Sequence, residues 1–210
     1  MKKNELDRRT FLRNSILTGA SAVLAPSLLA KSKQKETQVD NKPLIKRKLG
    51  KTGIELPIVS FGVMRSDSPA LIREAIKEGI VLFDTAHGYQ GGRNEEMLGE
   101  VLKDYPRNSF VLATKVPPEF SNRQDGGTGS AFNRKAFLEN LDISLKRLKM
   151  DYVDIFYAHG LMNRDTVLSK ELMETLIDIK KSGKVKHVGV STHTNQAEVI
   201  RACIESEFMK

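Results

Sequence analysis

The chain has 210 residues, which is enough for one substantial hydrophobic core with short attached segments. Its formal charge is +8, but residues 1–51 carry 13 Lys and Arg against 4 Asp and Glu, leaving 21 against 22 for residues 52–210. The main part of the chain therefore has no basic excess, and we expect no nucleic acid as a partner. Cys203 is the only cysteine, which excludes an intramolecular disulfide, and its helical spacing with Ile200 and Ile204 predicts a small core residue.

Residues 1–30 have the order of an export signal, in which positive charges precede an apolar stretch and then small residues. The apolar stretch, 16–30, is too short and too weakly apolar for a stable membrane span. Segment 7–13 (DRRTFLR) resembles the twin-arginine signal, in which two adjacent arginines are followed by Phe-Leu. The resemblance implies that the twin-arginine export machinery is a partner and that the protein is periplasmic. The alternative is an amphipathic helix with an incidental Arg8-Arg9 pair.

Residues 31–43 (KSKQKETQVDNKP) lack the apolar content needed for a core and predict a linker. The remaining chain, 44–210, is then the folded domain. It opens with turn residues at Gly50 and Gly53, which predict a hairpin over 47–57.

After this hairpin, short apolar runs alternate with longer stretches whose apolar residues recur every three or four positions, the pattern of strand–helix units. Ser68 is the predicted N-cap of the first helix, and Gly79 ends it. Five units are predicted, with strands over 58–63, 81–86, 110–116, 153–159 and 185–192, and helices over 69–78, 94–103, 133–149, 169–182 and 196–205.

Such a series of units folds either as a barrel or as a doubly wound sheet, since both use right-handed crossovers. A Gly-rich dinucleotide turn is missing after the first strand, where the sequence reads FGVM. Instead Asp84, Lys115, His159 and Ser191 stand at the ends of four successive predicted strands. This distribution favours an α/β fold of the (β/α)₈ TIM-barrel type, in which one pocket draws residues from several strands.

Several segments together resemble the aldo-keto reductase family. They are Asp84-Thr85-Ala86-His87-Gly88-Tyr89, Thr114-Lys115, Ala158-His159 and Gly189-Val190-Ser191. The resemblance extends from about Leu49 to about Glu205 and includes Asn94-Glu95-Glu96-Met97-Leu98-Gly99. It implies an NADPH-dependent oxidoreductase that reduces a small-molecule aldehyde or ketone to an alcohol, with NADP as the oxidised cofactor.

The resemblance also implies roles for individual residues. Tyr89 would be the general acid that protonates the carbonyl oxygen, because a neighbouring ammonium group, that of Lys115, eases loss of the phenol's proton. Asp84 would hold Lys115 charged and aimed, and His159 would orient the substrate carbonyl. Taken singly, these residues also fit roles without catalysis. The lysine could be a solvated strand end, the aspartate a cap and the tyrosine part of the surface packing.

Ser191 and Thr192 occupy the place where family members commonly use Ser-Asn to hold the nicotinamide carboxamide. Thr192 departs from that pattern, and since a hydroxyl replaces only one of two amide hydrogen bonds, Ser191 is the stronger candidate contact. His187 is expected within a strand, whereas His87 and His193 are expected on loops near the pocket. Segment 117–132, which contains three glycines, predicts a flexible loop over the substrate site.

A complete barrel needs eight strands and typically ~250 residues, so five units predict an incomplete barrel. We therefore expect the chain by itself to bind NADPH weakly. Two other functions remain open from the residues. One is a metal-dependent barrel hydrolase or isomerase that uses Asp84, His87, His159 and His193. The other is a non-catalytic binding fragment that retains the pocket.

Overall fold

A computed structural model describes residues 44–122 and 130–206 of the chain. The predicted export signal and linker, residues 1–43, lie outside the described residues. Within the described ranges no helix combines the length and the apolar composition needed to cross a membrane.

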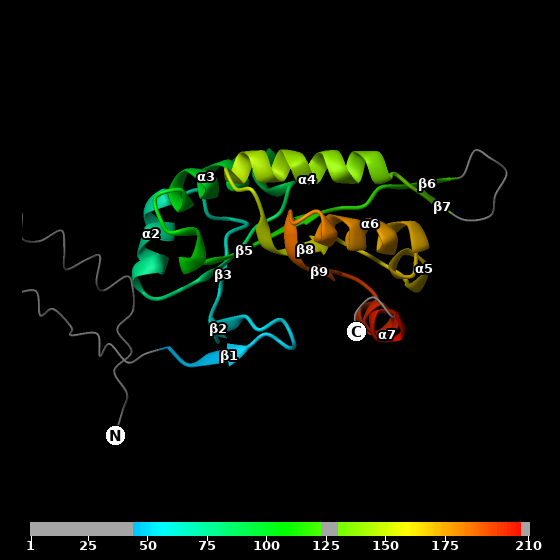
Figure 1. Cartoon of the computed structure of the whole chain (residues 1–210), viewed down its shortest axis with the longest axis horizontal. Coiled ribbons are helices and arrows are strands. Elements are labelled where there is room, and N and C mark those ends of the chain that lie inside the picture. The colour runs from blue at the N-terminus through cyan, green and yellow to red at the C-terminus, as the bar shows by residue number, and fades with distance from the viewer. Residues whose placement is uncertain (1–43, 123–129, 207–210) are drawn as a thin grey trace, which may run out of the picture. The chain divides into compact units, whose positions relative to one another are not determined.

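Five parallel strands form the central sheet (Figure 1). They are β3 (Phe61–Gly62), β4 (Leu82–Asp84), β5 (Val111–Val116), β8 (Val153–Ala158) and β9 (Val185–Val190). Each strand pairs with the next one along the chain, in the order β3-β4-β5-β8-β9. A doubly wound sheet would reverse its strand order at a switch point, and this sheet does not. The arrangement is that of five consecutive units of a (β/α)₈ barrel, as predicted.

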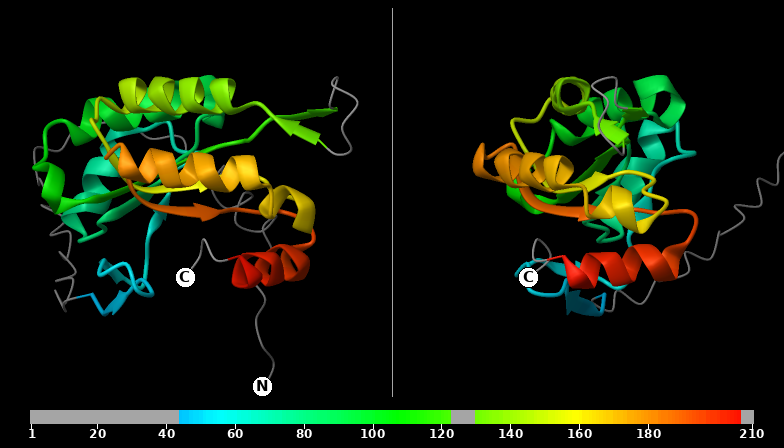
Figure 2. Two further views of the ribbon diagram at one scale, coloured as in Figure 1. Left: turned by 45° about the vertical axis from the view of Figure 1, so that its right-hand side comes forward. Right: turned by 90° about the vertical axis from the view of Figure 1, so that its right-hand side faces the viewer.

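A helix follows each strand of the sheet, and the views in Figures 1 and 2 show α3, α4 and α6 in one layer over the sheet. The Oγ atoms of Ser68 and Ser169 and the Oδ1 atom of Asn133 accept a hydrogen bond from the third residue after each of them, which starts α2, α6 and α4. The helices that follow strands are α2 (Pro69–Lys77), α3 (Arg93–Leu102), α4 (Arg134–Leu148), α6 (Lys170–Lys181) and α7 (Gln196–Glu205). The sequence pattern did not predict the short α5 (Arg164–Val167) or the 3₁₀ turns η1 (Tyr89–Gly92) and η2 (Arg107–Ser109).

The hydrophobic core lies between the sheet and this helix layer. Phe137 on α4 contacts Phe156 on β8, with ring centroids 5.6 Å apart, and Phe132 contacts Phe137 at 5.4 Å. The buried residues of α4 include Phe137, Leu141, Leu145 and Leu148, which recur every three or four positions, and Cys203 on α7 is buried as expected. Each large buried side chain of this kind contributes roughly 1.5–3 kcal/mol of transfer free energy, so the core is the main term that holds helices to sheet.

One expectation about local structure is wrong, and another is tested only in part. The strand predicted over 58–63 is only two residues long, because Ile58 N–H donates to Ile45 O and so continues the opening hairpin of β1 (Lys46–Lys48) and β2 (Glu55–Pro57). The two ends of segment 117–132, β6 (Phe120–Asn122) and β7 (Ser130–Phe132), pair as antiparallel strands, while residues 123–129 of the predicted loop lie outside the described residues. The Phe120 and Phe132 rings contact each other at 5.7 Å and join the core, a driving force that the glycine content of the segment obscured.

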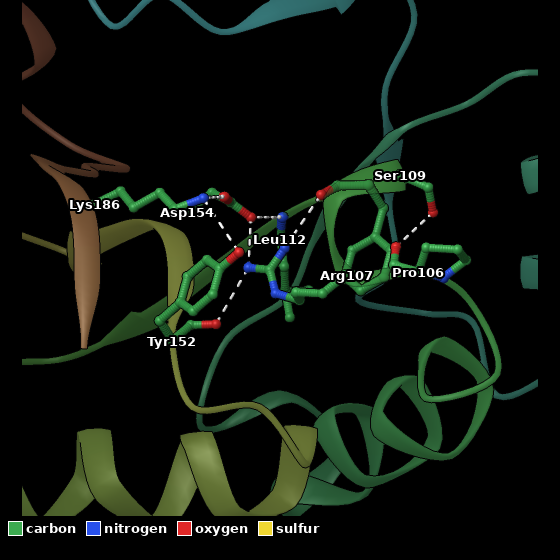
Figure 3. A network of polar contacts seen from close by, with 8 residues as sticks. Pro106, Arg107, Ser109, Leu112, Tyr152, Asp154 and Lys186 are labelled. Carbon is green, nitrogen blue, oxygen red and sulfur yellow. Dashed lines mark hydrogen bonds and ion pairs between the residues drawn. The ribbon is translucent and has the colours of Figure 1, made fainter. Parts of the chain in front are cut away.

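A polar network ties the amino ends of three strands together (Figure 3). Arg107 Nη2 donates to Asp154 Oδ2 at 2.6 Å, and the same oxygen accepts from Leu112 N–H at 3.0 Å. Lys186 Nζ donates to Asp154 Oδ1 at 3.0 Å and to Tyr152 Oη at 3.2 Å. Because Asp154 is buried and each of its oxygens has a cationic partner, the network holds β5, β8 and β9 in register.

Candidate active site

The residues predicted from strand ends meet at the carboxyl edge of the sheet. Asp84 ends β4, and Lys115 lies near the end of β5, where it is paired in register with Tyr157 on β8. His159 directly follows β8, and its N–H donates to Val116 O at 2.9 Å. Ser191 directly follows β9, and its N–H donates to Ala158 O at 3.0 Å. The backbone pairing that orders the sheet therefore brings these four residues to one edge.

Lys115 and Asp84 form an ion pair inside this edge. Lys115 is 8% exposed, and its Nζ atom donates to Asp84 Oδ1 and, at 2.7 Å, to the Thr85 carbonyl oxygen. Two acceptors aim the ammonium group and compensate for its loss of water. The structure thus brings Asp84 and Lys115 together as the prediction required.

Tyr89 completes the group from the loop that follows β4. Its ring centroid lies 5.1 Å from Lys115 Nζ and 6.3 Å from the His159 ring, which meets it edge-on at 84°. The Tyr89 N–H donates to Ala86 O at 3.0 Å, which starts the tight turn η1 directly after the strand. A phenol, an ammonium group and an imidazole from three successive units therefore surround one point.

His159 is held by Ser191. Its Nδ1 atom lies 2.7 Å from Ser191 Oγ, which also accepts from the Gly160 N–H at 3.2 Å. Burial lowers the pKa of His159 from its ordinary value of 6.5, and the charges of Lys115 and His193 lower it further. The negative charge of Asp84 acts in the opposite direction and raises it. The ring is therefore neutral near pH 7 and has one N–H to donate.

Among the described residues, the Thr192 side chain makes no hydrogen bond to Asp84, Tyr89, Lys115, His159 or Ser191. Its Oγ1 atom donates to Thr194 O at 2.5 Å and accepts from Thr194 N–H at 3.3 Å. The hydroxyl therefore closes a local turn. Of the two predicted cofactor contacts, Ser191 is the one that lies against His159.

The other histidines have different surroundings. His87, expected near the pocket, turns toward α4, where its Nδ1 atom lies 3.0 Å from Ser144 Oγ, and burial lowers its pKa. His187 lies within β9, as predicted, and His193 is exposed, with its ring 5.6 Å from that of His159. In residues 44–122 and 130–206 no group of three His, Cys, Asp or Glu side chains could hold a metal ion. The metal-dependent alternative therefore has no ligand set in the described part of the chain.

Tyr157 lies beside the proposed catalytic residues and was not predicted from the sequence. It pairs in register with Lys115 on one side and with Gly189 on the other, and a Cβ atom on Gly189 would lie 3.1 Å from its ring. Burial raises the pKa of Tyr157 above its ordinary value of 10, and the negative charge of Asp84 raises it further. The signal was available, because Tyr157 lies two positions before His159 and alternate residues of a strand share a face.

The comparisons with known proteins bear on the family and the fold of this chain. The model of the Aldo/keto reductase family matches residues 55–210. L-galactose dehydrogenase of Arabidopsis thaliana is 34% identical over 159 residues, which are 69% of this chain and 47% of that protein. The solved holo form of an aldo-keto reductase from Bacillus halodurans has a TM-score of 0.64 at 29% identity, over 78% of this chain and 54% of that one.

A second solved relative, an aldo-keto reductase from Klebsiella pneumoniae in complex with NADPH, has a TM-score of 0.55 at 25% identity, over 73% of this chain and 51% of that one. The fold and the family model together show that this chain belongs to the aldo-keto reductase family, a family of oxidoreductases. The chain spans about half the length of the curated relatives that it matches.

Proposed function

We propose that this chain carries the catalytic residues of an NADPH-dependent carbonyl reductase, which converts an aldehyde or ketone to an alcohol. The observation that carries the proposal is the position of Lys115, whose ammonium group contacts Asp84 and lies 5.1 Å from the Tyr89 ring. Family membership supports the reaction class. The direction of reaction and the substrate class belong to the proposal.

Tyr89 is the proton donor in this mechanism. A carbonyl oxygen that gains negative charge during reduction needs a proton, and the phenol supplies it from the loop after β4. The nearby ammonium group of Lys115 stabilises the phenolate that remains. Asp84 holds that ammonium group in place, so the pair acts on the substrate only through Tyr89.

His159 orients the substrate. The Ser191 hydroxyl already accepts from the Gly160 N–H, and its own hydrogen can be donated to Nδ1 of His159. The ring proton then sits on Nε2, where it donates to the carbonyl oxygen that Tyr89 protonates. A neutral imidazole serves this purpose, because it donates a hydrogen bond without competing for the proton.

The residues at this edge fit a nicotinamide cofactor. A carboxamide presents one acceptor and two donors, and the Ser191 oxygen, which accepts from the Gly160 N–H, has a second lone pair that can accept from the carboxamide nitrogen. A bound nicotinamide dinucleotide supplies the hydride that reduces the carbonyl carbon. The NADPH in the Klebsiella relative supports NADPH as the choice for this chain.

The test is Tyr89→Phe, with Tyr157→Phe as the control for loss of one phenol hydroxyl at the same edge of the sheet. NADPH oxidation is followed with a panel of small aldehydes and ketones, and NADPH affinity is measured by nicotinamide fluorescence. Tyr89→Phe should lower turnover about 10²–10⁴-fold with nearly unchanged NADPH affinity, while Tyr157→Phe keeps most of the turnover. A Tyr89→Phe variant with more than about a tenth of the parent turnover would assign the proton to another group, with His159 next in line.

A non-catalytic binding protein is distinguished by the same assay. It would bind NADPH and oxidise it with none of the carbonyl compounds, in the parent protein as well as in the variants. Because these five units by themselves are expected to bind NADPH weakly, both assays use a protein in which they stand within a complete barrel. Such a protein that neither binds nor oxidises NADPH would overturn the proposed function altogether.

We further propose that residues 1–30 direct the protein to the periplasm through the twin-arginine machinery. The support is in the sequence, where Arg8-Arg9 precedes Phe11-Leu12 and a weakly apolar stretch. Residues 31–43 then link this signal to the reductase domain, 44–210.

A further inference from the structure

Behind the candidate site, two fully buried polar residues open helix α3. Asn94 and Glu95 are both 0% exposed. The Asn94 amide nitrogen donates to Val63 O at 2.7 Å and to Ser66 O at 3.0 Å, and its Oδ1 atom accepts from Thr85 Oγ1 at 2.6 Å. Asn94 therefore fastens the loop after β3 to the residue that directly follows Asp84.

Glu95 fastens the next strand. Its Oε1 atom accepts from Thr114 Oγ1 at 2.7 Å, and Thr114 directly precedes Lys115 on β5. Its Oε2 atom lies 3.3 Å from Arg147 Nη1 on α4, an ion pair in which the carboxylate has no contact with solvent. A carboxylate buried without a partner costs several kcal/mol, so this position needs both Arg147 and the Thr114 hydroxyl.

Arg147 joins this pair to the loop that carries Tyr89. Its Nη1 atom donates to the His87 carbonyl oxygen at 3.0 Å, two residues before Tyr89. The guanidinium group reaches this place because Gly92 has no side chain, since a Cβ atom there would lie 2.3 Å from Arg147 Cζ. Gly92 also has φ +94, a left-handed conformation that favours glycine. The turn η1 and the position of the Arg147 guanidinium group therefore depend on the same residue.

We propose that Glu95 and Arg147 are positioning residues, which set the distance between Tyr89 and Lys115. Thr114 and the His87 carbonyl are the two points that they hold, and each lies within two residues of a proposed catalytic group. The His87 N–H in turn donates to the Lys115 carbonyl oxygen at 2.8 Å, so strand and loop are also joined to each other. That the distance between Tyr89 and Lys115 matters for catalysis rests on the proposed function, whereas the role of Glu95 and Arg147 in setting this distance does not.

The structure contains a matched pair that lacks these contacts. Glu100, also on α3, pairs with Lys149 at the end of α4, so it bridges the same two helices. Both partners are about half exposed, and neither contacts β5 or the Tyr89 loop in the described hydrogen bonds. Glu100→Gln is therefore a control for loss of one carboxylate on α3.

The experiment is native-state hydrogen exchange by NMR on the full 210-residue chain. The variants are Glu95→Gln, Arg147→Met, the two combined, and Glu100→Gln. The amides of His87 and Tyr89 report on the loop, and the Val153 amide, which donates to Lys184 O at 3.1 Å, reports on the sheet away from it. The two sets of amides distinguish local opening of the loop from global unfolding. Local opening speeds exchange at His87 and Tyr89 alone, whereas global unfolding also speeds it at Val153.

Both single variants should speed exchange at His87 and Tyr89 about tenfold or more, with Val153 within about twofold of the parent. The double variant should add little to either single variant, because both remove the same pair. Glu100→Gln should leave all three amides within about twofold. Where Arg147→Met does not fold, Arg147→Lys replaces it, since it keeps the charge and loses the fork of donors.

Equal acceleration at His87, Tyr89 and Val153, or none at His87 and Tyr89, would overturn the proposal and leave the network with a role in overall stability alone. Turnover is the second readout. In an active reductase, Glu95→Gln lowers kcat with NADPH affinity nearly unchanged, while Glu100→Gln changes neither. Accelerated loop exchange in the variants, together with a complete barrel that fails the NADPH assays given under Proposed function, would contradict that function and retain the positioning role.

Discussion

The Nδ1 atom of His159 lies 2.7 Å from the Oγ atom of Ser191, and this contact joins the residues that follow two neighbouring strands. Ser191 is also the proposed nicotinamide contact. One hydroxyl thus connects the group that orients the substrate with the group that holds the cofactor, so a change at Ser191 should affect both.

Ser191→Ala should therefore mix the two tautomers of His159, because the ring loses the partner at Nδ1. It should also lower kcat/KM roughly tenfold, the effect of about one hydrogen bond. Long-range ¹H–¹⁵N spectra of the histidine rings measure the tautomer, and Ser144→Ala, which removes the corresponding hydroxyl beside His87, is the control. A His159 ring with the same single tautomer in parent and variant would show that Ser191 does not set it.

Asp84→Asn should destabilise the fold by about 2 kcal/mol, because it leaves the nearly buried Lys115 ammonium group without its carboxylate. Lys115→Met should cost less, since it removes the charge that needs a partner. Urea unfolding measures both variants. Glu74→Gln, which breaks the exposed pair with Lys77, should change stability by less than ~1 kcal/mol. A larger loss of stability in Lys115→Met than in Asp84→Asn would contradict this explanation. It would mean that an unpaired ammonium group at position 115 costs little.

Stability should fall as the pH drops from about 7.5 to about 5. Burial lowers the pKa of His87, His159 and His187 below the ordinary value of 6.5 in the folded protein. The unfolded chain therefore binds more protons in this window, so unfolding is favoured as the pH falls, while the full contribution is present above about 6.5. Thermal unfolding across this range measures the effect. His87→Gln should flatten the dependence, and an unchanged slope in that variant would exclude His87 as a contributor.

Replacing Arg8 and Arg9 by lysine should keep a reporter fused to residues 1–43 in the cytoplasm. The twin-arginine signal requires the arginine pair, whereas an amphipathic helix or a general export signal needs only positive charge. Arg13→Lys is the matched control, and it should leave export unchanged. Export of the Arg8→Lys, Arg9→Lys fusion at the parent level would remove the twin-arginine route from consideration.

The residue pattern alone determined the alternation of strands and helices and four residues of the candidate site, whereas Tyr89 was found through the resemblance to a family. Asp84, Lys115, His159 and Ser191 could be found because a strand has a short apolar period that ends visibly, and parallel strands bring their carboxyl ends to one edge. The rhythm of the units fits both a barrel and a doubly wound sheet, and the position of these residues at successive strand ends favoured the barrel and its strand order. Each of these features depends on local sequence or on a general rule of chain connection.

Only the tertiary structure decided where side chains point and what they reach. His87 stands in the middle of the motif that identifies the family, yet it turns toward Ser144 on α4, away from the site. Glu95 belongs to a segment that resembles the family, but the sequence assigned it no role, and its place between Thr114 and Arg147 depends on the packing of α3 against α4. Contacts between residues 52 positions apart depend on how helices are seated on the sheet, which local periodicity does not specify.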